Sequence, residues 1–178
     1  MRLFRLSGLT ALSLLCLTSL AAAGEVKVKA VHLCCGGCVS AVTEALENVP
    51  GVSGGAASQD DGTVTVQATD AKAATAGLKA IAGAGFFGNA TYGGKKLPVP
   101  VAKIDPKQVA DSVTFTGVHL CCDTCVTASS EALKKVKGVS DVDGDQKNGS
   151  LTIKGKQMKM AELVDALHGA GFHGNVKK

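Results

Sequence analysis

A cysteine-rich segment occurs twice in this chain of 178 residues, and the repetition limits the folds that the chain can adopt. Residues 31–39 read VHLCCGGCV, and residues 118–126 read VHLCCDTCV. A later pair also matches, because residues 83–89 read GAGFFGN and residues 169–175 read GAGFHGN. Two copies are too few for a solenoid, which needs about three or more repeats to bury its core. The sequence therefore predicts two small domains that each fold alone and that share six of the seven cysteines between them.

The first 23 residues have the layout of a cleavable secretory signal. Arg2 and Arg5 precede an apolar run over residues 6–20, and three alanines follow at positions 21–23. A retained membrane anchor is the alternative, but the apolar run is shorter than the roughly 20 residues that a spanning helix needs. We therefore expect residues 1–23 to be removed, leaving a periplasmic or secreted protein that has no contact with the membrane.

Charge and composition argue against several functions. Loss of the two signal arginines lowers the Lys and Arg count from 19 to 17, against 15 acidic residues. So small an excess predicts no basic patch for nucleic acid or for an anionic membrane. The chain has no Trp, one Tyr and five Phe, so it also lacks the aromatic surface on which single-stranded nucleic acid stacks. No Ser-His-Asp set, paired-carboxylate motif or phosphate loop is visible in the sequence, and we expect no enzymatic activity.

Hydrophobic periodicity predicts the same six elements in each copy. Val26 and Val28 alternate with lysines, as in a strand with one buried face, whereas Val42 and Leu46 lie on one side of a helix. The first copy is expected to contain a strand at 26–31, a helix at 38–49, strands at 52–58 and 63–66, a helix at 71–82 and a strand at 90–92. The second is expected to contain a strand at 113–118, a helix at 125–136, strands at 139–143 and 150–153, a helix at 160–168 and a short strand at 176.

A spacer separates the copies. Residues 93–106 contain three of the four prolines and begin with two glycines. Prolines favour an extended, semi-rigid spacer, and the glycines permit a hinge. We predict a first domain over residues 24–93, a linker over residues 94–110 and a second domain over residues 111–178, with limited freedom to reorient.

The chain resembles the heavy-metal-associated (HMA) domain family, which includes copper chaperones, modules of copper-exporting ATPases and periplasmic mercury-binding proteins. The family carries Gly-Met-x-Cys-x-x-Cys at its first strand-to-helix loop and Ala-Gly-Tyr/Phe near its end. The resemblance covers both copies nearly end to end, and it implies an α+β chain of two ferredoxin-like βαββαβ domains in tandem. The matching residues are Cys35, Cys38, Ala84, Gly85 and Phe86 in the first copy, and Cys122, Cys125, Ala170, Gly171 and Phe172 in the second.

The paired cysteines are the predicted metal ligands: Cys35 with Cys38, and Cys122 with Cys125. The second cysteine of each pair is expected in the first turn of a helix, where free backbone N–H groups favour the thiolate. Thiolates select soft ions, so Cu(I) is the first candidate and Zn(II) or another thiophilic ion is the alternative. The resemblance implies a carrier or scavenger that holds one ion per copy and exchanges it with a partner protein.

Each copy departs from the family pattern at three positions. His32 and His119 replace the family's Gly, and leucines replace its Met. An additional cysteine, Cys34 or Cys121, precedes each pair. The additional thiols are candidate third ligands, disulfide partners or small buried residues. His32 and His119 are further candidate ligands, although histidines at such positions more often pack or form hydrogen bonds.

Two other functions use the same cysteines. In an exported protein, where disulfides persist, each Cys-x-x-Cys could close a disulfide in a structural or partner-binding module. Thiol-disulfide exchange also uses Cys-x-x-Cys at a helix start. Against exchange, the chain lacks a thioredoxin-like βαβ context and an aromatic residue flanking the cysteines.

Overall fold

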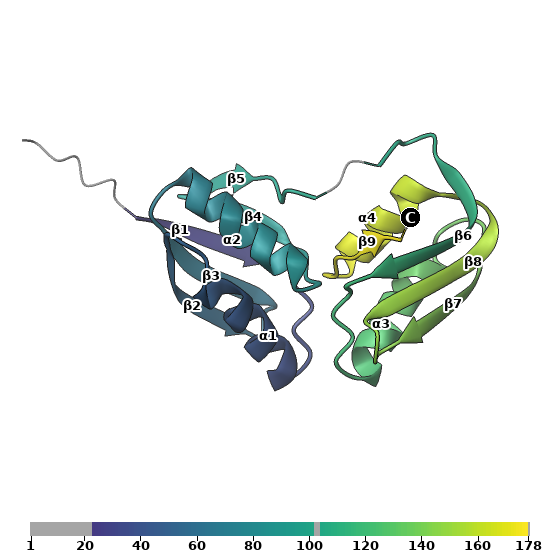
Figure 1. The fold of residues 1–178 in the computed structure, drawn as a ribbon, viewed down its shortest axis with the longest axis horizontal. Coiled ribbons are helices and arrows are strands. Elements are labelled where there is room, and N and C mark those ends of the chain that lie inside the picture. Colours follow the sequence, from purple (N-terminus) through teal and green to yellow (C-terminus); the bar gives the residue numbers. More distant parts are fainter. Residues whose placement is uncertain (1–22, 102–103, 178) are drawn as a thin grey trace, which may run out of the picture.

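The computed structural model describes residues 23–101 and 104–177, which form two α+β domains (Figure 1). The predicted signal segment, residues 1–23, lies outside the described residues except for its last position. The first domain contains β1 (Gly24–Lys29), α1 (Gly36–Glu47), β2 (Val52–Ser58), β3 (Thr63–Ala68), α2 (Ala71–Gly83), β4 (Asn89–Tyr92) and β5 (Lys95–Leu97). The second contains β6 (Val109–Thr116), α3 (Asp123–Lys134), β7 (Val139–Asp145), β8 (Ser150–Lys159), α4 (Met160–Gly169) and β9 (Asn175–Val176).

Each domain has one antiparallel sheet with its first strand inside. The strand order is β2-β3-β1-β4-β5 in the first domain and β7-β8-β6-β9 in the second. The expected ferredoxin-like fold is confirmed for both copies, because each has the order strand, helix, strand, strand, helix, strand. Among the described residues, no helix is long and apolar enough to cross a membrane.

Alternating side chains of the inner strands place the core between the sheet and the helices. Val26 and Val28 of β1 are buried, as are Val113 and Phe115 of β6. They meet the buried faces of the two helices of their own domain, which include Leu46, Leu78 and Ile81 in the first domain and Leu133, Leu163 and Leu167 in the second. Burial of such apolar surface, at about 25 cal/mol per Å², is the main term that holds each domain together.

Part of the segment expected to be a linker is ordered strand. β5 pairs with β4, so that Leu97 lies opposite Ala90 and extends the first sheet. β6 begins at Val109 and pairs along β8 as far as Lys159, so β8 is longer than the expected residues 150–153. The register along β6 and β8 shifts between Ala110 and Ser112, in a part of β6 that the hydrophobic pattern did not predict as strand.

The two domains pack against each other through their matching Gly-Ala-Gly-Phe segments. Phe86 and Phe172 form an antiparallel bridge. The N–H of Phe87 donates to the carbonyl of Gly171 over 2.9 Å, and the N–H of His173 donates to the carbonyl of Gly85 over 2.8 Å. The contacts on either side match, so the duplicated sequence produces a nearly symmetric interface. We expected two domains with limited freedom to reorient about a spacer, and the structure places them in direct contact.

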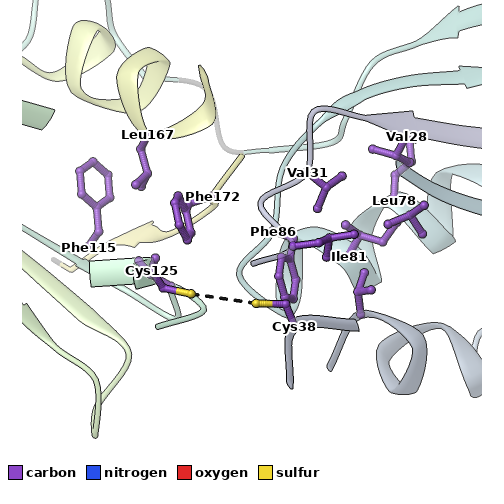
Figure 2. Close-up of a cluster of buried hydrophobic side chains, with 14 of the residues drawn as sticks. Val28, Val31, Cys38, Leu78, Ile81, Phe86, Phe115, Cys125, Leu167 and Phe172 are labelled. Carbon is purple, nitrogen blue, oxygen red and sulfur yellow. Dashed lines mark hydrogen bonds between the residues drawn. The ribbon is translucent and has the colours of Figure 1, made fainter. Parts of the chain in front are cut away.

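Aromatic rings complete this interface. The ring of His32 lies against Phe172, with centroids 4.3 Å apart, and Phe86 lies against His119 at 4.4 Å. Both phenylalanines are fully buried, as expected of core residues, and each also covers the histidine of the other domain. Beside these rings, Cys38 at the start of α1 and Cys125 at the start of α3 face each other across the interface (Figure 2).

Candidate metal centre

Six cysteines from the two domains meet at the interface. In each copy the loop after the first strand carries the adjacent pair, Cys34 and Cys35 or Cys121 and Cys122, and the helix carries the third. Cys35 and Cys122 are the N-cap residues of α1 and α3, and Cys38 and Cys125 lie in the first helical turn, as predicted. All six are free thiols in the structure.

The sulfurs lie within a few ångströms of one another, both inside each copy and across the interface. Within a copy, Sγ of Cys38 lies 3.7 Å from both Cys34 and Cys35, and Cys125 lies 3.7 Å from both Cys121 and Cys122. The distances across the interface are Cys35–Cys121 3.3 Å, Cys34–Cys125 3.4 Å, Cys34–Cys122 3.5 Å, Cys38–Cys121 3.5 Å and Cys38–Cys125 4.0 Å. Figure 2 shows the Cys38–Cys125 contact, with Phe86 and Phe172 on either side.

These sulfurs form two groups of four, each of which could hold a metal ion. One group is Cys34, Cys35, Cys38 and Cys121, and the other is Cys34, Cys121, Cys122 and Cys125. Both groups therefore include the two additional cysteines that the family pattern lacks. We refer to the six sulfurs together as the thiol cluster.

Backbone amides at the helix starts favour the thiolate of the two N-cap cysteines. The backbone N–H of Cys125 and then the thiol of Cys34 lower the pKa of Cys122 to about 6. The backbone N–H of Cys38 and then the thiol of Cys121 lower the pKa of Cys35. Both thiols therefore have more anionic character at neutral pH than an ordinary cysteine, which is the form that binds a metal ion.

Three of the sulfurs, those of Cys34, Cys121 and Cys125, are held towards the neutral thiol. Burial raises the pKa of Cys34 to about 12, and it also raises the pKa values of Cys121 and Cys125. Cys121 is exposed as a residue, but its sulfur lies within 3.7 Å of Cys35, Cys38 and Cys125. Six anions cannot share so small a volume without a compensating positive charge. A bound cation would supply that charge and release the protons.

We predict a fixed order of alkylation for the reduced protein. Cys122 and Cys35 should react first with iodoacetamide at pH 7, because their thiolates are favoured. Cys38 and Cys125 should react last, because neither residue has exposed surface. Peptide mass spectrometry over time measures the order, and the rate at Cys122 should rise through about pH 6. Labelling of Cys125 as fast as Cys122 would contradict the structure.

The two candidate histidines lie beside the thiol cluster and outside both four-sulfur groups. His32 and His119 stack on the phenylalanines described above, and Nε2 of each is buried without a hydrogen-bond partner. Burial lowers the pKa of both imidazoles, and His32 adds to the effect at His119. The structure thus gives them a packing contact across the interface.

Sequence reasoning did not identify a second pair of histidines. Nε2 of His168 lies 3.0 Å from Nδ1 of His173, and the ring of His168 stacks on Phe87 of the other domain at 3.7 Å. Burial, followed by the charge of His173, lowers the pKa of His168 to about 4, so this contact holds neutral imidazole. The replacement of Phe87 by His173 in the second copy was the available signal. Its partner His168 belongs to the same domain, and the packing of the domains adds the stack of His168 on Phe87.

Residues 114–173 match the model of the heavy-metal-associated domain, so most of the second copy is a domain of this family. The solved structures that resemble the chain include oxidized MerP from Ralstonia metallidurans CH34, with 26% identity and a TM-score of 0.36, covering 38% of this chain and 96% of that one. The HMA domain of the copper chaperone for superoxide dismutase is 24% identical with a TM-score of 0.35, covering 44% of this chain and 80% of that one. No curated protein sequence matches the chain significantly.

Another match to a solved structure spans most of the chain's length. The N-terminal soluble domains of Bacillus subtilis CopA are 16% identical with a TM-score of 0.31, covering 89% of this chain and 96% of that one. Heavy-metal-associated domains are typically metal-binding chaperone or transport modules rather than catalysts. Together with the cysteine groups, the family match indicates a protein that binds or transfers a soft heavy-metal ion.

Proposed function

We propose that this protein is an exported carrier or scavenger that holds soft metal ions, Cu(I) first, and passes them to a partner protein. The observation that carries the proposal is the thiol cluster, in which six sulfurs from two domains lie within 4.0 Å of their neighbours. Thiolate sulfur prefers Cu(I) and other soft ions to hard cations. All four ligand atoms in each group are cysteine sulfurs. Four cysteine sulfurs also suit Zn(II), so Zn(II) is the alternative cargo.

Transfer to a partner requires that a ligand can be reached from solvent. Cys121 is exposed, and Cys34, Cys35 and Cys122 are partly exposed, so an incoming thiolate has access to one side of the cluster. Cys38 and Cys125 are buried and would release the ion last. Exchange of one sulfur at a time avoids a free ion, and it suits a carrier better than a permanent structural site.

Export is part of the proposal and rests on residues 1–23, with their basic start, apolar run and alanine end. The test is to fractionate cells that express the full chain and to sequence the N-terminus of the mature protein. A chain that begins near residue 24 outside the cytoplasm is expected, and an uncleaved chain in the cytoplasm would contradict the proposed location.

We predict that the reduced mature protein loses half of its bound Cu(I) when Cys35 and Cys38 are both replaced by serine. The substitution removes two sulfurs of one four-sulfur group and leaves the other group complete. Native mass spectrometry with Cu(I), and separately with Zn(II), gives the number of ions per chain. The matched control replaces Cys122 and Cys125, which should have the same effect. An unchanged number of ions would remove these residues from the site.

Thiol-disulfide exchange is the second candidate function, because the partly exposed thiol of Cys122 has a pKa of about 6. Such a thiol attacks disulfides readily at neutral pH. The discriminating measurement is reduction of a disulfide-bonded protein substrate by the reduced chain in the absence of metal. Repeated reduction of the substrate with a supplied reductant would favour thiol-disulfide exchange. Absence of such turnover, together with binding of Cu(I) by the same reduced chain, would favour metal carriage.

A further inference from the structure

We propose that the two domains share one two-ion cluster, in which Cys34 and Cys121 each bridge both ions. The inference rests on the proposed metal-binding function and deepens it, because separate sites in the two domains would serve that function equally well. The bridging residues are the two cysteines that the family pattern lacks. For the alternative cargo, ions of the Zn(II) or Cd(II) class, the cluster would take two ions, each bound by four sulfurs.

The number of available sulfurs is too small for two separate four-sulfur sites, so the two ions must share ligands. A tetrahedral thiolate site takes four ligands, so two independent sites would need about eight sulfurs. Each domain supplies only three at the cluster. The two four-sulfur groups reach the required number because both include Cys34 and Cys121. Six sulfurs therefore complete two four-coordinate sites only when two of them are used twice.

The additional cysteines also make the shortest sulfur–sulfur contacts across the interface. Cys34 lies 3.5 Å from Cys122 and 3.4 Å from Cys125, the paired cysteines of the other domain. Cys121 lies 3.3 Å from Cys35 and 3.5 Å from Cys38. Each additional cysteine is thus as close to the other domain's pair as it is to the helical cysteine of its own domain, at 3.7 Å.

The spacing of the sulfurs fits a tetrahedral ion. Zn–S bonds of about 2.3 Å at tetrahedral angles place neighbouring sulfurs about 3.8 Å apart. Four of the six sulfur pairs around the first site are 3.3 to 3.7 Å apart, and all six lie within 4.8 Å. Four of the six pairs around the second site are 3.4 to 3.7 Å apart, with the same upper limit for all six. A small adjustment of the sulfur positions on binding would bring both groups to the expected spacing.

A shared cluster connects metal loading to the contact between the domains. Each ion would be bound by sulfurs of both domains, so release of either ion breaks a metal–sulfur link between the two cysteine loops. The packing of Phe86 and Phe172 against the opposite histidines already holds these loops together. Metal and aromatic packing would therefore stabilise the same closed arrangement, and a partner that opens it would gain both ions.

The test uses the reduced mature full chain loaded with Zn(II) for X-ray absorption and with ¹¹³Cd(II) for NMR. The absorption spectrum should show about four sulfurs per zinc and a Zn–Zn distance below twice the Zn–S bond length of about 2.3 Å. The cadmium spectrum should show two signals per chain. Wild-type protein suffices for both measurements, so neither depends on how a variant folds.

Single substitutions then identify the bridges. Cys34→Ser should shift both cadmium signals and weaken retention of both ions against a competing chelator, and Cys121→Ser should do the same. Cys35→Ser is the matched control, and it should strongly affect one ion only, because Cys35 belongs to one four-sulfur group. The shared cluster would be overturned if two ions bind, no short metal–metal distance is observed and Cys34→Ser alters only one cadmium signal. That result would leave the proposed function standing. Failure to bind Zn(II), Cd(II) or Cu(I) at all would overturn both.

Discussion

Replacing Gly171 with alanine is expected to open the contact between the two domains. A Cβ atom at this position would overlap the backbone N–H of His32 and lie 2.9 Å from the carbonyl oxygen of Ala30, both in the other domain. The backbone there has φ of +86°, a conformation that costs a non-glycine residue roughly 1–2 kcal/mol. Because the clash is with backbone, it is relieved only if the domains move apart.

The measurement is the yield of cross-linking between Cys35 and Cys121 under mild oxidation, with small-angle scattering as a second readout. The yield should fall by about tenfold or more, since even 1.4 kcal/mol shifts an equilibrium tenfold, and the radius of gyration should rise. Gly169→Ala is the matched control, because a Cβ there meets nothing within 4 Å. Equal cross-linking in both variants would show that the domains do not dock through this segment.

Phe172→Ala should destabilise the second domain and also weaken its contact with the first. The side chain is fully buried, and truncation of a buried phenylalanine typically costs about 3–5 kcal/mol. Phe172 also covers His32 of the other domain at 4.3 Å, so the same change leaves a gap in the interface. Urea denaturation measures the first effect, and the Cys35–Cys121 cross-linking yield measures the second.

Phe115→Ala separates these two effects. Phe115 is also fully buried, and it lies in β6 opposite Leu151 and Val176, inside the second domain. Its truncation should lower the free energy of unfolding by a similar amount while the cross-linking yield of the folded protein stays near that of the wild type. If Phe115→Ala reduced cross-linking as much as Phe172→Ala, the interface would depend on the stability of the domain rather than on this ring.

The elements of each domain were predictable because their causes are local. Alternation at Val26 and Val28 determines which face of β1 is buried, and apolar spacing from Cys38 to Leu46 determines the buried face of α1. The helix begins at Gly36, two residues before the start that this pattern predicted, so the N-cap position of Cys35 was not predicted. The sequence also did not reveal β5 or the second half of β8, because these segments are strands only through pairing with β4 and β6.

The sequence by itself determined the duplicated α+β domain, the placement of each Cys-x-x-Cys at a helix start and the soft-ligand chemistry of the six thiols. Only the tertiary structure decided that the cysteines of the two copies lie together in one cluster. Nothing in the spacing of Cys34 and Cys122 along the chain indicates that their sulfurs lie 3.5 Å apart. That distance arises from the docking of residues 83–89 against residues 169–175, where glycines allow close approach of two backbones and phenylalanines fill the space between them. A surface that two folded domains form together depends on shape, and local sequence patterns do not encode it.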